Sequence, residues 1–313
     1  MNRRVLVQRP LSLLPHHPRR FCTSPRVAKD RRIPGVGREI IDDFAQLREH
    51  YATPKNPIVL AHGLFGFSEL RLAPRLLPAV RYWHGIQDAL RTSGATVIAT
   101  SVPPSSSIAE RAAALAAGIA AAQQASSPPS SSSSSSPPPP VNIIAHSMGG
   151  LDARYMISRL LPSAPPTVRV ASLTTIATPH RGSPAADFLL DPSSRFFPLH
   201  LPRLYGLLTR AGLGTEAFAQ LTTAYARDVF NPATPDAPGV RYFSYGADAA
   251  PLSPFSVFRL PHAVVAAAEG ANDGLVSVAS SRWGEYRGTL VGVGHADLIN
   301  WSNRMRWALR AMI

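Results

Sequence analysis

A serine between small residues stands at the end of an apolar, β-branched run. Residues 141–150 read VNIIAHSMGG, so Ser147 has Ala145 two positions before it and Gly149 two positions after it. The pattern is close to G-x-S-x-G, a strained strand-to-helix turn that exposes the serine hydroxyl and needs small residues because bulky ones would clash. We interpret Ser147 as a nucleophile and the backbone N–H of Met148, at the start of the next helix, as a donor to a developing oxyanion.

A second glycine-containing turn follows an earlier apolar run. Residues 58–66 read IVLAHGLFG, a short strand that ends in His-Gly-x-x-Gly. Glycine lets the chain bend back so that a backbone N–H points into a site. We expect Leu64 to supply the second N–H of an oxyanion hole, with Phe65 as the alternative. His62 is expected to brace this loop rather than to transfer protons.

A serine hydroxyl also needs a general base. In proteins with this strand–turn–helix serine, the chain order is serine, then acid, then histidine. Four histidines follow Ser147, namely His180, His200, His262 and His295. His295 lies between a strand-like run and a closing helix, where a loop would present it at the carboxyl edge of a sheet. We predict His295 as the base, with His180, at the end of another strand, as its main rival.

The base in turn needs an orienting carboxylate. Asp273 lies in EGANDGLVS, where Asn-Asp-Gly is a strong turn signal, and Asp248 directly follows the strand-like run 240–246. The turn could place the Asp273 carboxylate beside the histidine, or simply need local hydrogen bonds. Chain order alone does not separate Asp273 from Asp248.

The elements that must position these residues alternate along the chain. Strand-like runs at 57–61, 95–100, 141–145, 168–177, 240–246 and 288–293 are interspersed with helical patterns at 84–93, 108–124, 149–161 and 297–312. Continuous apolar strands of this kind predict a mostly parallel sheet with helices on both faces. Residues 126–140 are only Ser and Pro, which cannot build a regular element. We expect a surface loop there, with a domain boundary as the alternative.

Composition excludes several classes of protein. The chain has 313 residues, is 45% hydrophobic and contains one cysteine, Cys22. It is therefore neither wholly disordered, nor a disulfide-stapled miniprotein, nor a zinc-finger protein. No window reaches about 18 strongly apolar residues, so we expect no transmembrane segment. Ten of the 32 basic residues lie in residues 1–40, and the folded body has no basic cluster of the kind that nucleic-acid binding requires.

The N-terminus has the composition of a targeting sequence. Residues 1–29 carry seven basic residues, no acidic residue and several hydroxyl side chains, which is typical of a mitochondrial transit peptide. We expect residues 1–35 to be a disordered, cleaved presequence and residues 36–313 to form one α/β domain. A plain basic tail on a cytoplasmic or lipid-droplet-associated protein is the alternative.

At this point the sequence resembles the α/β-hydrolase lipases. It is similar to bacterial true lipases of the Pseudomonas and Burkholderia type and to fungal mitochondrial triacylglycerol lipases. The stretches that carry the resemblance are AHGLFG (61–66), AHSMGG (145–150), TPHRGSP (178–184), GVRYFSYG (239–246), EGANDGLVSVASSRWG (269–284) and GHADLIN (294–300). The resemblance implies Ser147 as nucleophile, Asp273 as acid and His295 as base, with the N–H groups of Leu64 and Met148 as the oxyanion hole. It also implies a helical lid at about 184–232.

Two features depart from the family pattern. The bacterial lipases carry a structural calcium ion near the histidine, and Asp297 matches one of its ligands. No acid in residues 249–265 matches the partner ligand, so no metal is expected. Some relatives have a disulfide after the Asn-Asp-Gly turn, where this chain has Ala279. Neither a metal nor an organic cofactor is needed for the implied chemistry.

These observations together predict a serine hydrolase of lipid esters, with a triacylglycerol lipase as the first hypothesis. The predicted lid region carries about nine large apolar side chains between arginines, which favours a long acyl chain and contact with a lipid–water interface or membrane surface. A fixed helical cap is the alternative for that region. A phospholipase, carboxylesterase or acyl-thioesterase of the same fold, or a catalytically inactive binding module, are the alternative functions.

Overall fold

The structure is a computed structural model, and the parts of the chain that it describes are residues 52–64, 82–83, 85–126, 138–163, 168–191, 216–249, 252, 256 and 258–300. The predicted presequence, most of the Ser/Pro segment, the middle of the predicted lid and most of the predicted closing helix lie outside these residues. Phe65 and His200 also lie outside them.

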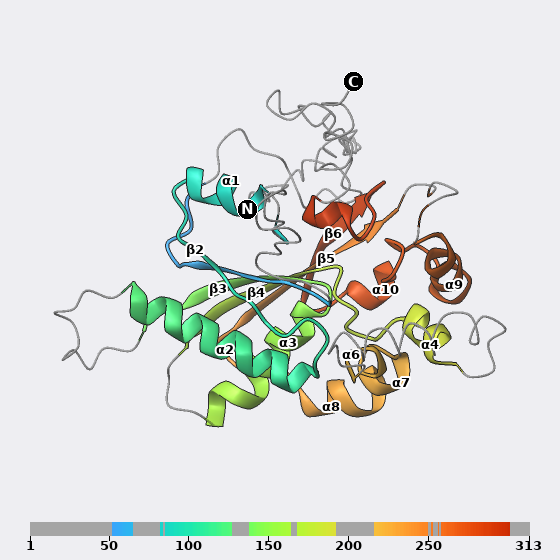
Figure 1. The fold of residues 1–313 in the computed structure, drawn as a ribbon, viewed down its shortest axis with the longest axis horizontal. Coiled ribbons are helices and arrows are strands. Elements are labelled where there is room, and N and C mark those ends of the chain that lie inside the picture. The colour runs from blue at the N-terminus through green and yellow to red at the C-terminus, as the bar shows by residue number, and fades with distance from the viewer. Residues whose placement is uncertain are drawn as a thin grey trace, which may run out of the picture.

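The described residues contain one parallel sheet of six strands in the order β2-β1-β3-β4-β5-β6 (Figure 1). The strands are β1 (Ile58–Ala61), β2 (Val97–Ala99), β3 (Val141–His146), β4 (Val170–Ile176), β5 (Arg241–Asp248) and β6 (Glu285–Val291). All five neighbouring pairs are parallel, which confirms the predicted arrangement. The sixth strand begins three residues before the predicted range, because Glu285 and Tyr286 extend the ladder along β5.

Helices connect these strands. Those of the sheet layers are α1 (Ile86–Thr92), α2 (Ile108–Ala125) and α3 (Gly149–Tyr155), and α3 continues as a π-helical turn (Met156–Leu160) and a 3-10 turn (Leu161–Ser163). Those beyond β4 are α4 (Pro184–Leu190), α6 (Glu216–Ala219), α7 (Thr223–Tyr225), a π-helical turn (Ala226–Phe230), α8 (Asn231–Ala233), α9 (Arg259–Glu269), α10 (Val278–Ser281) and a 3-10 turn (Asp297–Ile299). The described ends of the predicted lid region are thus helical.

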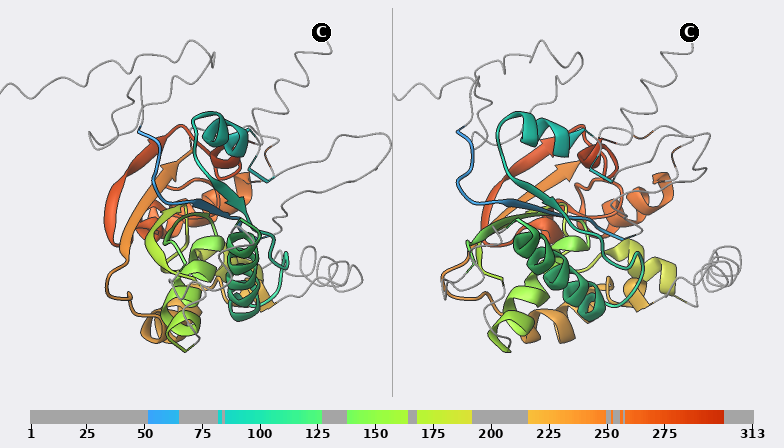
Figure 2. Two further views of the ribbon diagram at one scale, coloured as in Figure 1. Left: turned by 90° about the vertical axis from the view of Figure 1, so that its left-hand side faces the viewer. Right: turned by 60° about the vertical axis from the view of Figure 1, so that its left-hand side comes forward.

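The two faces of the sheet follow from alternation along the strands. In β1, Val59 and Ala61 face the core that α2, α3 and the π-helical turn cover, whereas Ile58 and Leu60 face a second core with Trp83 and α1. Figure 2 shows α2 and α3 on one side of the sheet and α1 on the other. Helix α2 begins at a capping box in which the Ser107 side chain accepts from the backbone N–H of Glu110. Among the described residues, no helix combines the length and apolarity that a membrane crossing needs.

The strand order places two loops opposite each other. β1 lies between β2 and β3, so the connections after β1 and β3 leave the sheet on either side of a topological switch point. A Cβ at Gly63, just after β1, would lie 2.7 Å from the Cβ of Ser147, just after β3. The two turns singled out by the sequence therefore meet at the carboxyl edge of the sheet.

Candidate active site

The turn around Ser147 is strained and crowded. Ser147 has a φ of 55°, a left-handed conformation that a non-glycine residue rarely adopts. A Cβ at Gly149 would lie 2.7 Å from the carbonyl oxygen of His62, and one at Gly150 would lie 2.2 Å from Thr178 Oγ1. The predicted need for small residues after the serine is confirmed, and it arises from the close approach of the β1 and β4 loops.

The structure brings three of the predicted site residues together in one line. Ser147 Oγ lies 3.0 Å from His295 Nε2, and His295 Nδ1 lies 2.7 Å from Asp273 Oδ2. Asp273 is fully buried, and His295 is only 8% exposed. Hydroxyl, imidazole and carboxylate are thus connected by hydrogen bonds over 148 positions of sequence.

The Asn-Asp-Gly turn holds the carboxylate in place. Asp273 Oδ1 accepts hydrogen bonds from the backbone N–H groups of Leu275 (3.0 Å) and Val276 (2.8 Å), which leaves Oδ2 for His295. The Asp273 carbonyl also accepts from the backbone N–H of His295 at 2.8 Å. Both interpretations of Asp273 therefore hold. Its carboxylate makes the hydrogen bonds of its own turn and also contacts the ring of His295.

The competing acid lies elsewhere. Asp248 ends β5, where its Oδ1 accepts from the backbone N–H of Asn272 at 3.2 Å and its carbonyl from that of Gly292 at 2.7 Å. These bonds support the turn that carries Asp273. Asp248 is therefore a bracing residue behind the site, and Asp273 is the one bonded to His295.

The rival histidine is locked into a different cluster. His180 is fully buried, its Nε2 lies 3.0 Å from Thr175 Oγ1, and its ring stacks on Trp283 with centroids 5.2 Å apart. Arg154 NH1 lies 3.4 Å from its Nδ1. Burial, followed by the neighbouring guanidinium groups, holds the pKa of His180 well below its usual range. His262 lies on α9, and its carbonyl accepts from the side-chain amide of Asn272 at 3.3 Å.

The two predicted oxyanion donors flank the serine. Met148 caps α3, where the first N–H groups of a helix have no acceptor within the helix. Leu64 follows Gly63 in the turn after β1, and the side chains of Leu64 and Met148 pack into one apolar cluster with Ile108 and Leu221. The two backbone segments that carry the predicted donors thus lie close together beside Ser147.

His62 braces the first of these loops, as the sequence suggested. Its Nε2 accepts from the backbone N–H of Val102 at 3.2 Å, so its Nδ1 carries the proton that it shares with the Gly63 carbonyl at 3.0 Å. Burial, reinforced by the Arg111 guanidinium, lowers the pKa of His62 to about 4. A ring held neutral in this way supports the loop without taking up protons near neutral pH.

Comparison with known proteins identifies the family. Triacylglycerol lipase 2 of Saccharomyces cerevisiae is 38% identical over 303 residues, which cover 86% of this chain and 87% of the relative. The chain belongs to the triacylglycerol lipase family. A triacylglycerol lipase of Burkholderia plantarii is 32% identical over 141 residues, or 45% of this chain. No protein-family model matches the sequence.

Solved structures show the same fold. A lipase of Bacillus licheniformis, BlEst2 in its mature form, superposes with a TM-score of 0.58 at 21% identity, over 83% of this chain and 94% of that one. The lipase of Staphylococcus hyicus gives 0.57 at 19% identity, over 81% and 91%. The α/β-hydrolase fold is thereby confirmed. This member of the family is a carboxylic ester hydrolase that acts on lipid esters.

The aspartate that matches a calcium ligand has a local role in this lipase. Asp297 Oδ2 accepts from the backbone N–H of Gly294 at 2.9 Å, which closes the loop that carries His295. Within the described residues, no group of three or more His, Cys, Asp or Glu side chains is arranged to hold a metal ion. The Asp297 side chain thus stabilises the loop that carries His295 by hydrogen bonding.

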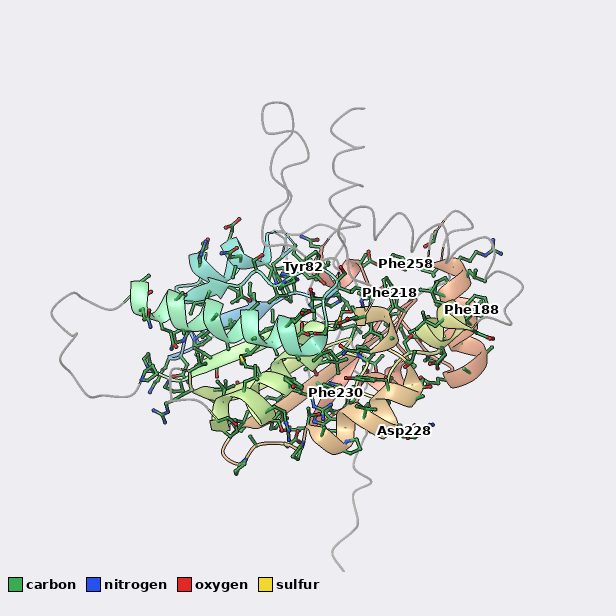
Figure 3. All side chains as sticks on the ribbon, turned by 60° about the horizontal axis from the view of Figure 1, so that its bottom comes forward. Tyr82, Phe188, Phe218, Asp228, Phe230 and Phe258 are labelled. Carbon is green, nitrogen blue, oxygen red and sulfur yellow. The ribbon has the colours of Figure 1, made fainter. Side chains whose placement is uncertain are left out.

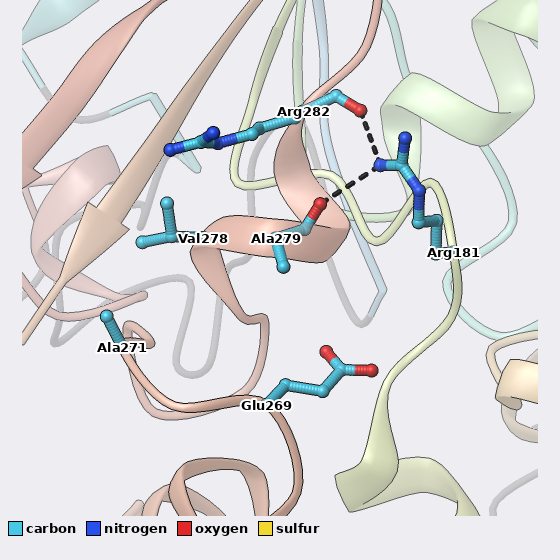
Figure 4. Close-up of a pocket in the computed structure, with 6 residues that line it drawn as sticks. All are labelled: Arg181, Glu269, Ala271, Val278, Ala279 and Arg282. Atoms are coloured by element: carbon cyan, nitrogen blue, oxygen red, sulfur yellow. Dashed lines mark hydrogen bonds between the residues drawn. The ribbon is translucent and has the colours of Figure 1, made fainter.

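A surface hollow of about 400 Å³ lies apart from these residues (Figure 4). Arg181, Glu269, Ala271, Val278, Ala279 and Arg282 line it. Arg181 NH1 donates to the carbonyl oxygens of Ala279 (3.0 Å) and Arg282 (2.7 Å), so this arginine fastens α10 to the loop after β4. Ser147, His295 and Asp273 are not among the residues that line the hollow.

Sequence reasoning missed two groups around the serine. Tyr82 Oη lies 2.7 Å from His146 Nδ1, and Arg111 forms a fully buried ion pair with Asp152 at 2.8 Å. Burial raises the pKa of Asp152 to about 6, against the opposing effect of Arg111. His146 stands next to the serine and could have drawn notice, whereas no local pattern marks Tyr82, Arg111 or Asp152.

Proposed function

We propose that this lipase hydrolyses triacylglycerols through a covalent acyl-enzyme on Ser147, with His295 as general base and Asp273 as orienting acid. The observation that carries the proposal is the continuous hydrogen-bonded line from Ser147 Oγ through His295 to Asp273. A serine, an imidazole and a buried carboxylate in this order are the parts that acyl transfer requires.

The direction of proton transfer follows from these contacts. Asp273 accepts a hydrogen bond from the protonated Nδ1, so the neutral ring of His295 presents an unprotonated Nε2 to the serine. As Ser147 Oγ attacks the ester carbonyl carbon, Nε2 takes the hydroxyl proton, and the carboxylate stabilises the imidazolium that forms. When the tetrahedral intermediate collapses, Nε2 returns the proton to the departing alcohol oxygen. Water then attacks the acyl-enzyme by the same route and releases the fatty acid.

The oxyanion of each tetrahedral intermediate needs fixed donors. The backbone N–H groups of Leu64 and Met148 are the proposed pair, and each such donor contributes about 3–4 kcal/mol to the transition state in other serine hydrolases. Because they are backbone groups on packed segments, they require little reorganisation as the charge develops.

Apolar surroundings support a long acyl chain. Helix α4 packs against α6 and α9. Phe188 lies in α4, Phe218 in α6, and Phe258 directly before α9 (Figure 3). Thr223 donates to the Asp187 carboxylate through its backbone N–H (2.9 Å) and its Oγ1 (2.6 Å), which ties the two described ends of the 184–232 region together. We propose that this region is a lid that contacts a lipid–water interface or a membrane surface.

Phospholipids, soluble esters and thioesters are the alternative substrates, since the same three side chains would serve them all. A substrate profile separates these possibilities. The decisive measurement is fatty-acid release from emulsified long-chain triacylglycerol and from a soluble short-chain ester by the full chain.

We expect both reactions, and we expect Ser147→Ala to abolish them without unfolding the protein. Ser93→Ala, which alters an exposed serine at the end of α1, is the matched control. Short-chain activity alone would make the protein a carboxylesterase and the 184–232 region a fixed cap. Ester hydrolysis that survives Ser147→Ala, or no labelling of Ser147 by a fluorophosphonate, would contradict the catalytic proposal.

We further propose mitochondrial targeting by residues 1–35, supported by their many basic residues and few acidic ones. Fusion of these residues to a fluorescent protein should direct it to mitochondria. A cytoplasmic or lipid-droplet pattern for both this fusion and the full chain would refute the proposal.

A further inference from the structure

A buried tyrosine hydroxyl bridges the two loops that meet at the serine. Tyr82 is 6% exposed, its Oη accepts from the backbone N–H of Gly63 at 3.1 Å, and it lies 2.7 Å from His146 Nδ1. Its ring belongs to the apolar cluster that also contains Trp83 and Ile299, and Figure 3 labels its position. None of these groups takes part in the proposed proton transfers.

One end of this bridge has a fixed direction. The Gly63 N–H can only donate, so the Tyr82 oxygen accepts from it. The 2.7 Å contact between Tyr82 Oη and His146 Nδ1 is a hydrogen bond in either neutral tautomer of His146, with the hydroxyl or the ring as the donor. Burial, followed by the neighbouring His295, holds the pKa of His146 well below its usual range, so the ring is neutral.

The bridge joins the residues that directly precede the proposed catalytic groups. Gly63 comes before Leu64, and His146 comes before Ser147. The packing between them is close, since a Cβ at Gly63 would lie 2.7 Å from the Ser147 Cβ and 3.0 Å from Tyr82 Oη. Because the Gly63 N–H is already bound to Tyr82, the next N–H along the loop, that of Leu64, is the one left for an oxyanion.

The same histidine also contacts the proposed base. The rings of His146 and His295 have centroids 4.6 Å apart. Two imidazolium ions at that separation would repel each other in a buried site. A His146 kept neutral by burial allows His295 alone to become charged when it takes the serine proton.

We propose that Tyr82 is a positioning residue for acyl transfer, which sets the Gly63–Leu64 loop against the Ser147 turn through the chain Gly63 N–H, Tyr82 Oη, His146 Nδ1. This inference rests on the proposed serine mechanism. It assigns Tyr82 an effect on the transition state, where the oxyanion exists, rather than on the binding of the ground-state ester.

Tyr82→Phe tests the inference, because it removes one oxygen and keeps the ring. We expect kcat on a soluble short-chain ester to fall by about tenfold, less than the loss of a whole oxyanion donor, with KM changed by less than about twofold. Inhibition by a trifluoromethyl ketone, which forms an oxyanion on the serine, should weaken by a similar factor. Inhibition by the free fatty acid should not change.

The matched control is Tyr242→Phe, which removes a hydroxyl that also accepts from a backbone N–H, that of Ala237 at 3.0 Å. Tyr242 is the second residue of β5, whereas Ser147 lies at the opposite, carboxyl edge of the sheet. If both variants lose stability but keep their kcat, Tyr82 is only a packed core residue and the proposal is wrong. An increase in KM with an unchanged kcat would overturn the proposal as well.

Replacements of His146 give a second route, which also serves if Tyr82→Phe does not fold. Asn places an amide group, which can accept or donate, near the Nδ1 position and should retain most of the activity, whereas Leu offers no hydrogen-bonding group and should lose it. Tyr82→Phe should reduce kcat further in the Asn background but not in the Leu background. If Tyr82→Phe lowers kcat by the same factor in the Asn and Leu backgrounds, the proposed bridge is wrong. A wild-type chain without Ser147-dependent hydrolysis would refute the underlying function instead.

Discussion

Two buried histidines of this lipase have nearly the same contact with a hydroxyl group but lie next to opposite charges. His295 Nε2 lies 3.0 Å from the hydroxyl of Ser147, and His180 Nε2 lies 3.0 Å from the hydroxyl of Thr175. The difference lies in the group that contacts the other ring nitrogen, Nδ1. The Nδ1 of His295 meets the Asp273 carboxylate, whereas the Nδ1 of His180 faces the Arg154 guanidinium.

The sign of that third charge decides the chemistry. A carboxylate stabilises an imidazolium, so a hydroxyl on the other side can lose its proton to the ring. A guanidinium destabilises it, and Arg154 is itself fixed, stacked 3.6 Å from the Trp283 ring centroid and donating to the Thr234 carbonyl at 3.0 Å. A hydroxyl next to a histidine is therefore not evidence of a nucleophile until the group behind the histidine is known.

The largest expected effect comes from altering the charge behind His295. Asp273→Asn keeps the size of the side chain but presents an amide to Nδ1, which favours the wrong tautomer. We expect kcat on a soluble ester to fall by about 10⁴-fold, with unfolding by urea little changed. Asp248→Asn, which touches the turn but not the histidine, is the control and should keep kcat within about threefold. Equal losses in both variants would mean that the turn, rather than the charge, matters.

The next effect concerns His180, where we expect stability to change and catalysis to persist. His180→Ala leaves a cavity beside Trp283 and removes a partner of Thr175 and Arg154. The free energy of unfolding should fall by about 3 kcal/mol, as measured by urea denaturation. The kcat of the remaining folded protein should stay within about threefold of wild type. A loss of kcat comparable to that of Asp273→Asn would place His180 in the reaction and remove the contrast.

A smaller effect is expected from pH. His62 is also backed by an arginine, Arg111, and its pKa is about 4 in the folded chain against about 6.5 when unfolded. The unfolded state binds the proton first as the pH falls, so the stability due to neutral His62 is full above pH 6.5 and is lost as the pH falls toward 4. Between pH 7 and pH 5 this amounts to about 2 kcal/mol.

The measurement for His62 is the free energy of unfolding against pH for wild type and His62→Gln. The glutamine does not titrate, so the wild-type curve should fall more steeply over this range while other groups cancel in the difference. Parallel curves would show that burial and Arg111 do not hold His62 neutral. His180 would then be the remaining example of a histidine kept neutral beside an arginine.

Much of the site could be predicted because its signals are local. The Ser147 turn is recognisable because Gly149 and Gly150 must be small where strands and loops pass within van der Waals distance. The strands were recognisable because their apolar runs are continuous in a sheet covered on both faces. Their boundaries were less predictable, as β6 shows, since its first residues are set by pairing with β5 rather than by their own composition.

The choice between Asp273 and Asp248 could not be made from the residues alone. Asp248 follows a strand-like run and Asp273 lies in a turn, both accept backbone hydrogen bonds, and only the family resemblance favoured Asp273. The structure places Asp273 against His295 because their loops lie side by side, with the backbone N–H of His295 donating to the Asp273 carbonyl. Tyr82 left no local signal at all, because its importance lies in two partners, 19 and 64 positions away.

The sequence by itself determined the alternation of strands and helices, the serine turn and the set of histidines and aspartates that could serve it. These depend on interactions between near neighbours in the chain, such as the apolar pattern of a strand and the steric limits of a turn. Only the tertiary structure decided which charge stands behind each histidine. That charge comes from a distant segment, brought there by the order of the strands, and the energy of a buried imidazolium depends on the distance and sign of its neighbours.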